Sequence, residues 1–119
     1  MINKTLIITR DSVAAGDDVD APHEMLIEFN ENEKVEKIIK TILKSNYLPK
    51  IYGGKATWCI IADKPLAIIA QEWFNPKVID QLDYLKSAKE FSKLHFKYHV
   101  QEDPELVFEQ YLARKNNST

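Results

Sequence analysis

The clearest pattern along the chain is a helical repeat of apolar positions between residues 34 and 44. Apolar side chains recur at the three- and four-residue spacing that lines one face of an α-helix, and they are Val35, Ile38, Ile39, Ile42 and Leu43. Lysine and glutamate fill most of the other positions, which is typical of a face that meets water. Asn30 and Glu33 have the spacing of a capping arrangement, so the sequence predicts one amphipathic helix that starts soon after Asn30 and ends near Asn46.

Strands are predicted on both sides of this helix. Residues 6–8 and 23–29 precede it and predict an antiparallel pair, because the second of them alternates apolar and acidic positions. Residues 56–62 and 66–73 follow it and are apolar at nearly every position, which is typical of central strands covered on both faces. Residues 94–100 alternate again and favour a last strand.

Two further helices are expected in the last third of the chain. One begins at Asn75-Pro76 and the other at Asp103-Pro104, since proline is tolerated in a first helical turn. The first of them lines one face with Val78, Leu82, Leu85, Ala88 and Phe91. The fold class is therefore α+β, a single domain over residues 1–119 in which a mixed or antiparallel sheet is packed by helices. Residues 115–119 are expected to fray.

The order of elements in the first 73 residues is strand, strand, helix, strand, strand. This order resembles a β-grasp-like ββαββ core, in which a mixed sheet wraps one helix, with the C-terminal helices added to it. The chain differs from the sulfur carriers and modifiers of that class because it ends in Asn117-Ser118-Thr119 and not in Gly-Gly.

Composition is that of an ordinary globular domain, with 45% hydrophobic and 29% charged residues. The longest apolar runs, 58–62 and 66–70, are far shorter than the roughly 20 residues of a membrane-spanning helix. The N-terminal segment lacks the apolar length of a secretory signal, and the lone Cys59 lies in an apolar strand, where a thiol is buried and inert. We therefore expect a cytoplasmic protein with no membrane segment.

Charge is segregated along the chain although the formal net charge is only −2. Lysines predominate from residue 37 to 97, whereas residues 11–36 contain Lys34 as their only basic residue and these acidic ones: Asp11, Asp17, Asp18, Asp20, Glu24, Glu28, Glu31, Glu33 and Glu36. Such asymmetry can steer an oppositely charged partner. The connection between the first two strands is also long, and long ordered loops are often functional. The predicted partner-binding residues are Asp11, Asp17, Asp18, Asp20 and Glu24.

The same loop holds oxygen and imidazole groups that metal ions use, with Asp18, Asp20 and His23 as the candidates. Their spacing matches no calcium loop, because the third oxygen position falls on Pro22. The alternative is that these residues form turns and bind backbone amides. We predict no metal site and no cofactor.

Other candidate chemistry is also better explained by structure. His95 and His99 have the spacing of a zinc helix, but on a strand they stand about 13 Å apart and cannot share one ion. Gly53-Gly54-Lys55 lacks the spacing of a phosphate-binding loop and suits a tight turn. No nucleophile has an assigned base, so no catalytic residue is predicted. We predict no nucleic-acid binding, because several of the lysines occupy the polar face of the helix and the isoelectric point is about 5.9.

Four short strings resemble those of a family of small uncharacterised bacterial proteins: residues 9–13, 16–18, 21–23 and 53–58. In its acidic, compact α+β character the chain is also similar to bacterial toxin-immunity proteins, which bind and neutralise a cognate toxin. That similarity implies a protein-binding module whose acidic surface meets a basic toxin. Two alternatives stay open: a small metal-dependent enzyme that uses the Asp/His loop, and a ubiquitin-like adaptor with exposed apolar residues on its sheet. Whether Trp58 and Trp73 lie in the core or at an interface is also open.

Overall fold

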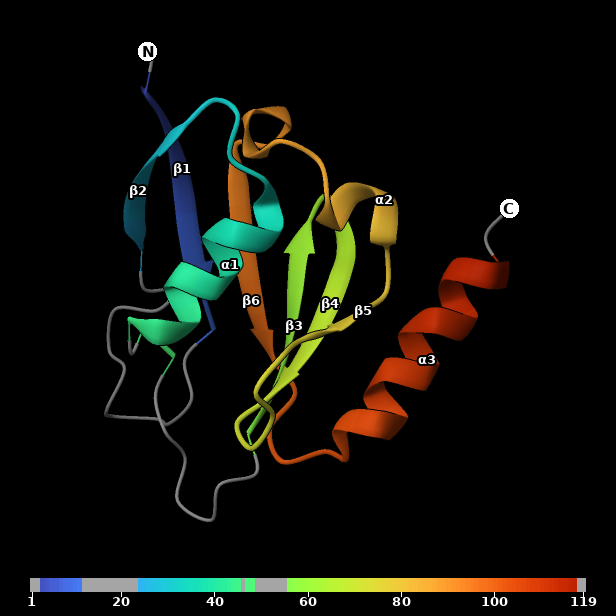
Figure 1. Cartoon of the computed structure of the whole chain (residues 1–119). Coiled ribbons are helices and arrows are strands. Elements are labelled where there is room, and N and C mark those ends of the chain that lie inside the picture. The colour runs from blue at the N-terminus through green and yellow to red at the C-terminus, as the bar shows by residue number, and fades with distance from the viewer. Residues whose placement is uncertain (1–2, 12–23, 46, 49–55, 118–119) are drawn as a thin grey trace.

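The computed structural model describes residues 3–11, 24–45, 47–48 and 56–117, and Figure 1 shows their arrangement. The elements follow one another as β1 (Asn3–Arg10), β2 (Met25–Asn30), α1 (Val35–Lys44), β3 (Thr57–Ala62), β4 (Lys64–Ala70), β5 (Lys77–Val78), α2 (Gln81–Tyr84), the short 3₁₀ helix η1 (Ala88–Glu90), β6 (Lys93–Tyr98) and α3 (Pro104–Asn117). The fold is mixed α+β in one compact unit, as the sequence predicts. No helix within these residues is both long and apolar enough to cross a bilayer.

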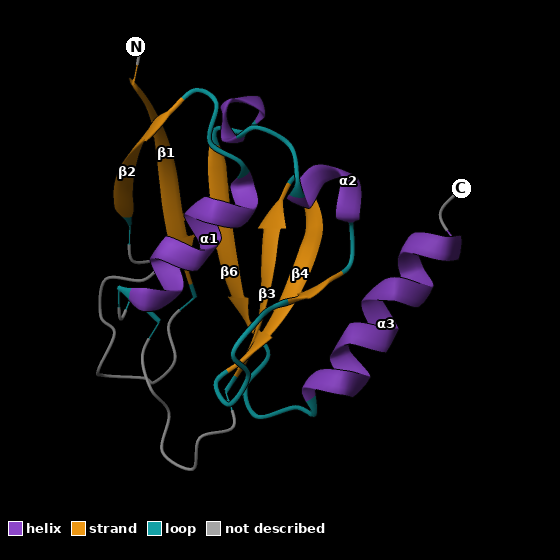
Figure 2. Ribbon diagram, in the orientation of Figure 1, coloured by secondary structure: helices purple, strands orange, loops and turns teal. Residues whose placement is uncertain are grey.

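The described strands form one six-stranded sheet in the order β2-β1-β6-β3-β4-β5. The predicted antiparallel pairing of β1 with β2 is confirmed, and Ile7 lies directly opposite Leu26. The late strand β6 inserts between β1 and β3; it runs parallel to β1 and antiparallel to β3. The sheet is therefore mixed, and its centre brings together strands from opposite ends of the sequence (Figure 2).

The two faces of the sheet are covered by different helices. Successive strand residues point to opposite faces, so Trp58 and Cys59 mark the two sides of β3. Trp58 belongs to the main core with the apolar face of α1, while Cys59 belongs to a second cluster with Val107 and Tyr111 of α3. The prediction that the central strands are covered on both faces is confirmed. In Figure 1, α1 crosses in front of the sheet and α3 lies along its β4–β5 side.

The Asn30–Glu33 arrangement forms, but it closes the turn before α1. A Glu33 carboxylate oxygen accepts a hydrogen bond from the Asn30 amide at 3.2 Å, and the Glu33 amide donates to the Asn30 carbonyl at 2.8 Å. The residue that precedes α1 is Lys34, which makes no side-chain capping bond. The pair thus fixes the β2–α1 connection rather than the first helical turn itself.

The helix predicted from Asn75 is wrong. The Ile79 and Asp80 amides donate to the Leu66 carbonyl, which draws this segment alongside β4. A helix begins only after Asp80, whose carboxylate accepts from the Asp83 amide, and it ends at Tyr84. Long-range pairing with β4 therefore overrides the local helical spacing.

Buried acids and exposed lysines hold this segment in place. The Lys64 ammonium bridges Asp80 at 3.2 Å and Asp83 at 3.0 Å, and the Lys86 ammonium contacts the other oxygen of Asp83 at 2.9 Å. Hydrogen bonds from Lys86 and then Lys64 hold the pKa of Asp83 below its ordinary value, despite the opposing effect of burial. The cluster anchors α2 against the start of β4.

Candidate functional site

The predicted acidic surface is only partly within the described residues. Asp17, Asp18, Asp20 and the metal candidate His23 lie outside them. Asp11 and Glu24 lie inside, at the two ends of the connection between β1 and β2. The Asp11 carboxylate is partly buried and hydrogen-bonded, whereas Glu24 is exposed.

Asp11 is bonded to its own chain. Its carboxylate accepts from His95 Nε2 at 2.9 Å through one oxygen and from the Tyr98 amide at 2.9 Å through the other. An ionised carboxylate has no proton to give, so the imidazole Nε2–H is the donor. Asp11 thereby ties the end of β1 to β6, and its charge is already partly compensated.

The same histidine continues the chain of contacts to Thr9. The Thr9 hydroxyl lies 2.7 Å from His95 Nδ1, so hydroxyl, imidazole and carboxylate follow one another as in hydrolytic triads. A nucleophile must reach its substrate, however, and Thr9 is buried between β1 and β6. We assign this array to the packing of the sheet and not to catalysis.

The Cys59 thiol and the His99 imidazole, which the sequence analysis considered for chemistry, also have structural roles. Burial raises the pKa of the Cys59 thiol to about 12, which keeps it protonated and unreactive. His99 Nε2 lies 2.8 Å from the Tyr111 hydroxyl and connects the end of β6 to α3. Trp58 belongs to the core, while Trp73 is half-buried beside the second cluster.

The structure shows an exposed apolar sheet face whose residues the sequence analysis did not name. The side of β2 and β1 opposite α1 carries Leu26 and Ile7, which are 61% and 36% exposed. They are direct cross-strand partners, so the two side chains stand next to each other. The α3 helix covers this face of the sheet over Cys59 and Ile68, on β3 and β4. We call the exposed surface formed by Leu26 and Ile7 the open face.

Carboxylates border the open face along β2. Glu28 lies two residues after Leu26, opposite Thr5, and Glu24 lies two residues before it; both are exposed. Neither has an ion-pair partner within the described residues. Lys93 lies on the other side of Ile7, on β6, so the acidic character is confined to the β2 side. Of the two predicted partner-binding residues within the described ranges, Glu24 is thus the one that lies at an exposed apolar surface.

The backbone of β2 is available as well. In the sheet order β2 is the terminal strand, and among the described residues its one partner is β1. An edge strand presents unpaired N–H and C=O groups that another chain can use. The open face and this edge meet along the same six residues.

Comparison with known proteins adds no identification. The chain matches no family model, no curated protein and no solved structure.

Proposed function

We propose that this chain is a cytoplasmic protein-binding module that meets a basic partner through the open face of β2 and β1. The observation that carries the proposal is the exposed pairing of Leu26 with Ile7 on β2 and β1, where β2 is the edge strand and pairs among the described residues with β1 alone. Apolar side chains exposed side by side on a sheet are typical of surfaces that another protein covers. The ubiquitin-like reading of the sequence requires such residues on the sheet.

The flanking charges define the partner. Glu24 and Glu28 stand on either side of Leu26 along β2, without ion-pair partners among the described residues. A partner segment that places lysine or arginine over these carboxylates and an apolar side chain over Leu26 would complement both features. Exposed charges act mainly on the association rate, so we expect fast, salt-sensitive binding.

An immunity-like role is the form of this proposal that the acidic loop suggests. Asp17, Asp18 and Asp20 precede Glu24 in the sequence and would extend the acidic border. Toxins that cleave nucleic acid need cationic clefts, which carboxylates can occupy in place of phosphates. Asp11 contributes less to such a surface, because its carboxylate is bonded to His95 and Tyr98.

A β-grasp-like classification of the fold is part of the same proposal. It is supported by the element order ββαββ in the first 70 residues and by the mixed sheet that packs against α1. It also suits the binding role, since one sheet face carries the helix and part of the other is free to meet a partner.

Affinity capture with matched variants tests the proposal. Leu26→Asp places a charge in the open face, and Leu82→Asp makes the same change at a leucine that is 81% exposed on α2. We expect the wild-type chain and Leu82→Asp to retain the same basic polypeptide from the native host, and Leu26→Asp to lose it. Retention of that polypeptide by Leu26→Asp, or capture of an acidic one, would refute the assignment of the surface.

A further inference from the structure

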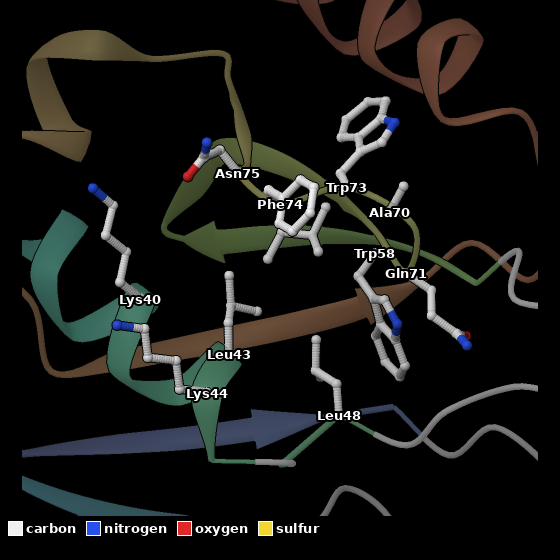
Figure 3. A pocket seen from close by; sticks show the side chains of 11 residues that line it. Lys40, Leu43, Lys44, Leu48, Trp58, Ala70, Gln71, Trp73, Phe74 and Asn75 are labelled. Atoms are coloured by element: carbon white, nitrogen blue, oxygen red, sulfur yellow. The ribbon is translucent and has the colours of Figure 1, made fainter.

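A second surface lies on the α1 side of the sheet, away from the open face. Here a cavity of about 500 Å³ separates the C-terminal half of α1 from the segment that follows β4. Its apolar lining includes Leu43 of α1, Leu48, Trp58 of β3 and Ile69 of β4. In Figure 3, Leu43 of α1, Leu48 after this helix and Trp58 of β3 lie around the same hollow.

Phe74 is the most unusual residue at this cavity. Its side chain is 99% exposed, although a phenyl ring buries more apolar surface than most side chains when it packs. The ring lines the cavity together with the half-buried Trp73 beside it. An aromatic ring held in water next to an apolar hollow is typical of a binding surface that is completed by a ligand.

Two lysines define the polarity of the cavity. Lys40 and Lys44 are four residues apart on α1, so they stand on the same face of the helix. In Figure 3 they lie at one end of the cavity, away from Trp58 and Gln71 at the other end. Within the part of the chain that the structure describes, neither ammonium group has a carboxylate partner. The cavity is therefore apolar along its length and positive at one end.

The geometry points to a binding site for a small amphipathic anion, with an apolar body and one anionic head. The apolar lining and Phe74 would enclose the body, and Lys40 and Lys44 would bind a carboxylate, sulfonate or phosphate head. The volume lies in the range of small-molecule sites, which is roughly 300–1,000 Å³.

This inference is independent of the proposed protein interface. The cavity is on the side of the sheet that packs against α1, whereas Leu26 and Ile7 are on the opposite side. A variant in one site leaves the residues of the other unchanged. Failure of one proposal therefore does not imply failure of the other.

Titration with anilinonaphthalene sulfonate tests the site directly. This dye joins a flat apolar body to one anionic group, and its fluorescence rises when water is excluded. N-phenylnaphthylamine has the same aromatic body without the sulfonate and serves as the neutral comparison. We expect saturable binding of one sulfonate dye per chain, at least roughly tenfold tighter than that of the neutral dye, because one tenfold step corresponds to a single modest charge interaction.

Matched variants of the chain locate the bound dye. Lys40→Ala combined with Lys44→Ala should weaken the sulfonate dye about tenfold or more and leave the neutral dye within about twofold. Lys37→Ala removes an exposed lysine of the same helix that does not line the cavity, and should change neither. Phe74→Ala should weaken both dyes, and since this ring is exposed the variant should keep the wild-type circular dichroism spectrum and melting temperature.

Competition identifies the chemistry of the occupant. Displacement of the dye by decanoate, and not by decanol, would support a small anion. Displacement only by an acidic apolar peptide would overturn the small-molecule assignment. Equal binding of both dyes, or equal loss in Lys37→Ala and in the double variant, would overturn the role of Lys40 and Lys44.

Discussion

Replacement of Asp11 by asparagine should destabilise the fold, because this carboxylate joins β1 to β6. One oxygen accepts from His95 Nε2 and the other from the Tyr98 amide, each at 2.9 Å. Asparagine keeps one acceptor oxygen but presents an NH₂ group in place of the other. Asp11→Asn therefore removes the negative charge from both hydrogen bonds. With its one oxygen kept for the Tyr98 amide, its NH₂ group faces His95 Nε2, which can accept only if the ring proton moves to Nδ1 beside the Thr9 hydroxyl.

The size of the effect follows from the exposure of the group. Hydrogen bonds to a charged partner contribute about 1.5–3 kcal/mol, and an unpaired buried donor costs about 1–3 kcal/mol. The Asp11 side chain is 40% exposed, so water can replace part of what is lost. We expect Asp11→Asn to lower the free energy of unfolding by about 1–2 kcal/mol.

Urea unfolding followed by tryptophan fluorescence measures this change. With an unfolding slope of about 1–3 kcal/mol per molar urea, the midpoint should fall by roughly 1 M. Glu24→Gln is the control, because Glu24 is exposed and has no ion-pair partner among the described residues; it should stay within about 0.5 kcal/mol of wild type. His95→Gln combined with Asp11→Asn should cost less than the sum of the two single changes. An Asp11→Asn midpoint equal to that of wild type would refute the structural role of this carboxylate.

Three further predictions concern the rest of the fold. Lys86 and Lys64 hold the folded-state pKa of Asp83 below its ordinary 3.8. The ionised carboxylate therefore stabilises the fold above pH 3.8, and this contribution is lost as the pH falls through the lowered pKa. The urea midpoints of wild type and Asp83→Asn should differ at pH 7 and converge in acid, and a difference that stays constant with pH would contradict this. Val107→Ala opens a cavity between α3 and β3, which should lower the free energy of unfolding by about 2 kcal/mol. Labelling of Cys59 by a thiol reagent should become roughly tenfold faster or more, because α3 then covers this thiol less well. An unchanged labelling rate would show that α3 does not protect Cys59. Val100 has φ 57°, a left-handed conformation that costs a residue with a side chain about 1–2 kcal/mol. Val100→Gly should therefore raise the melting temperature. A lower melting temperature would show that the strain is absent.

The periodicity of apolar residues predicts a helix or strand correctly where those same residues are buried in the fold. The amphipathic repeat ending at Lys44 and the apolar run around Trp58 give α1 and β3 nearly at their observed bounds. The segment after Asn75 fails because the Leu66 carbonyl, which no local pattern reveals, binds the amides of Ile79 and Asp80. The local pattern therefore fails where long-range hydrogen bonds take amides that the predicted helix would use, and it holds in β3, where pairing with the distant β6 agrees with the predicted strand.

The candidate site was less predictable because it depends on which part of the sheet α3 covers. Ile7 lies in an apolar run that a sequence pattern assigns to a core, whereas Leu26 shares its side of the alternating strand with Glu24 and Glu28. Both are exposed because α3 packs over Cys59 and Ile68 instead. The role of Asp11 depends on His95, which is 84 residues away in the sequence. Of the predicted partner-binding residues that the structure describes, Glu24, beside Leu26, is the exposed one.

Hydrogen–deuterium exchange on the chain bound to its captured partner tests the proposed interface most directly. The amides of β2, between Met25 and Asn30, should gain protection on binding, together with those of the Ile7 region. Protection of α3 or of the cavity beside Phe74, with β2 exchanging as in the free chain, would contradict the assignment of the open face as the partner-binding surface.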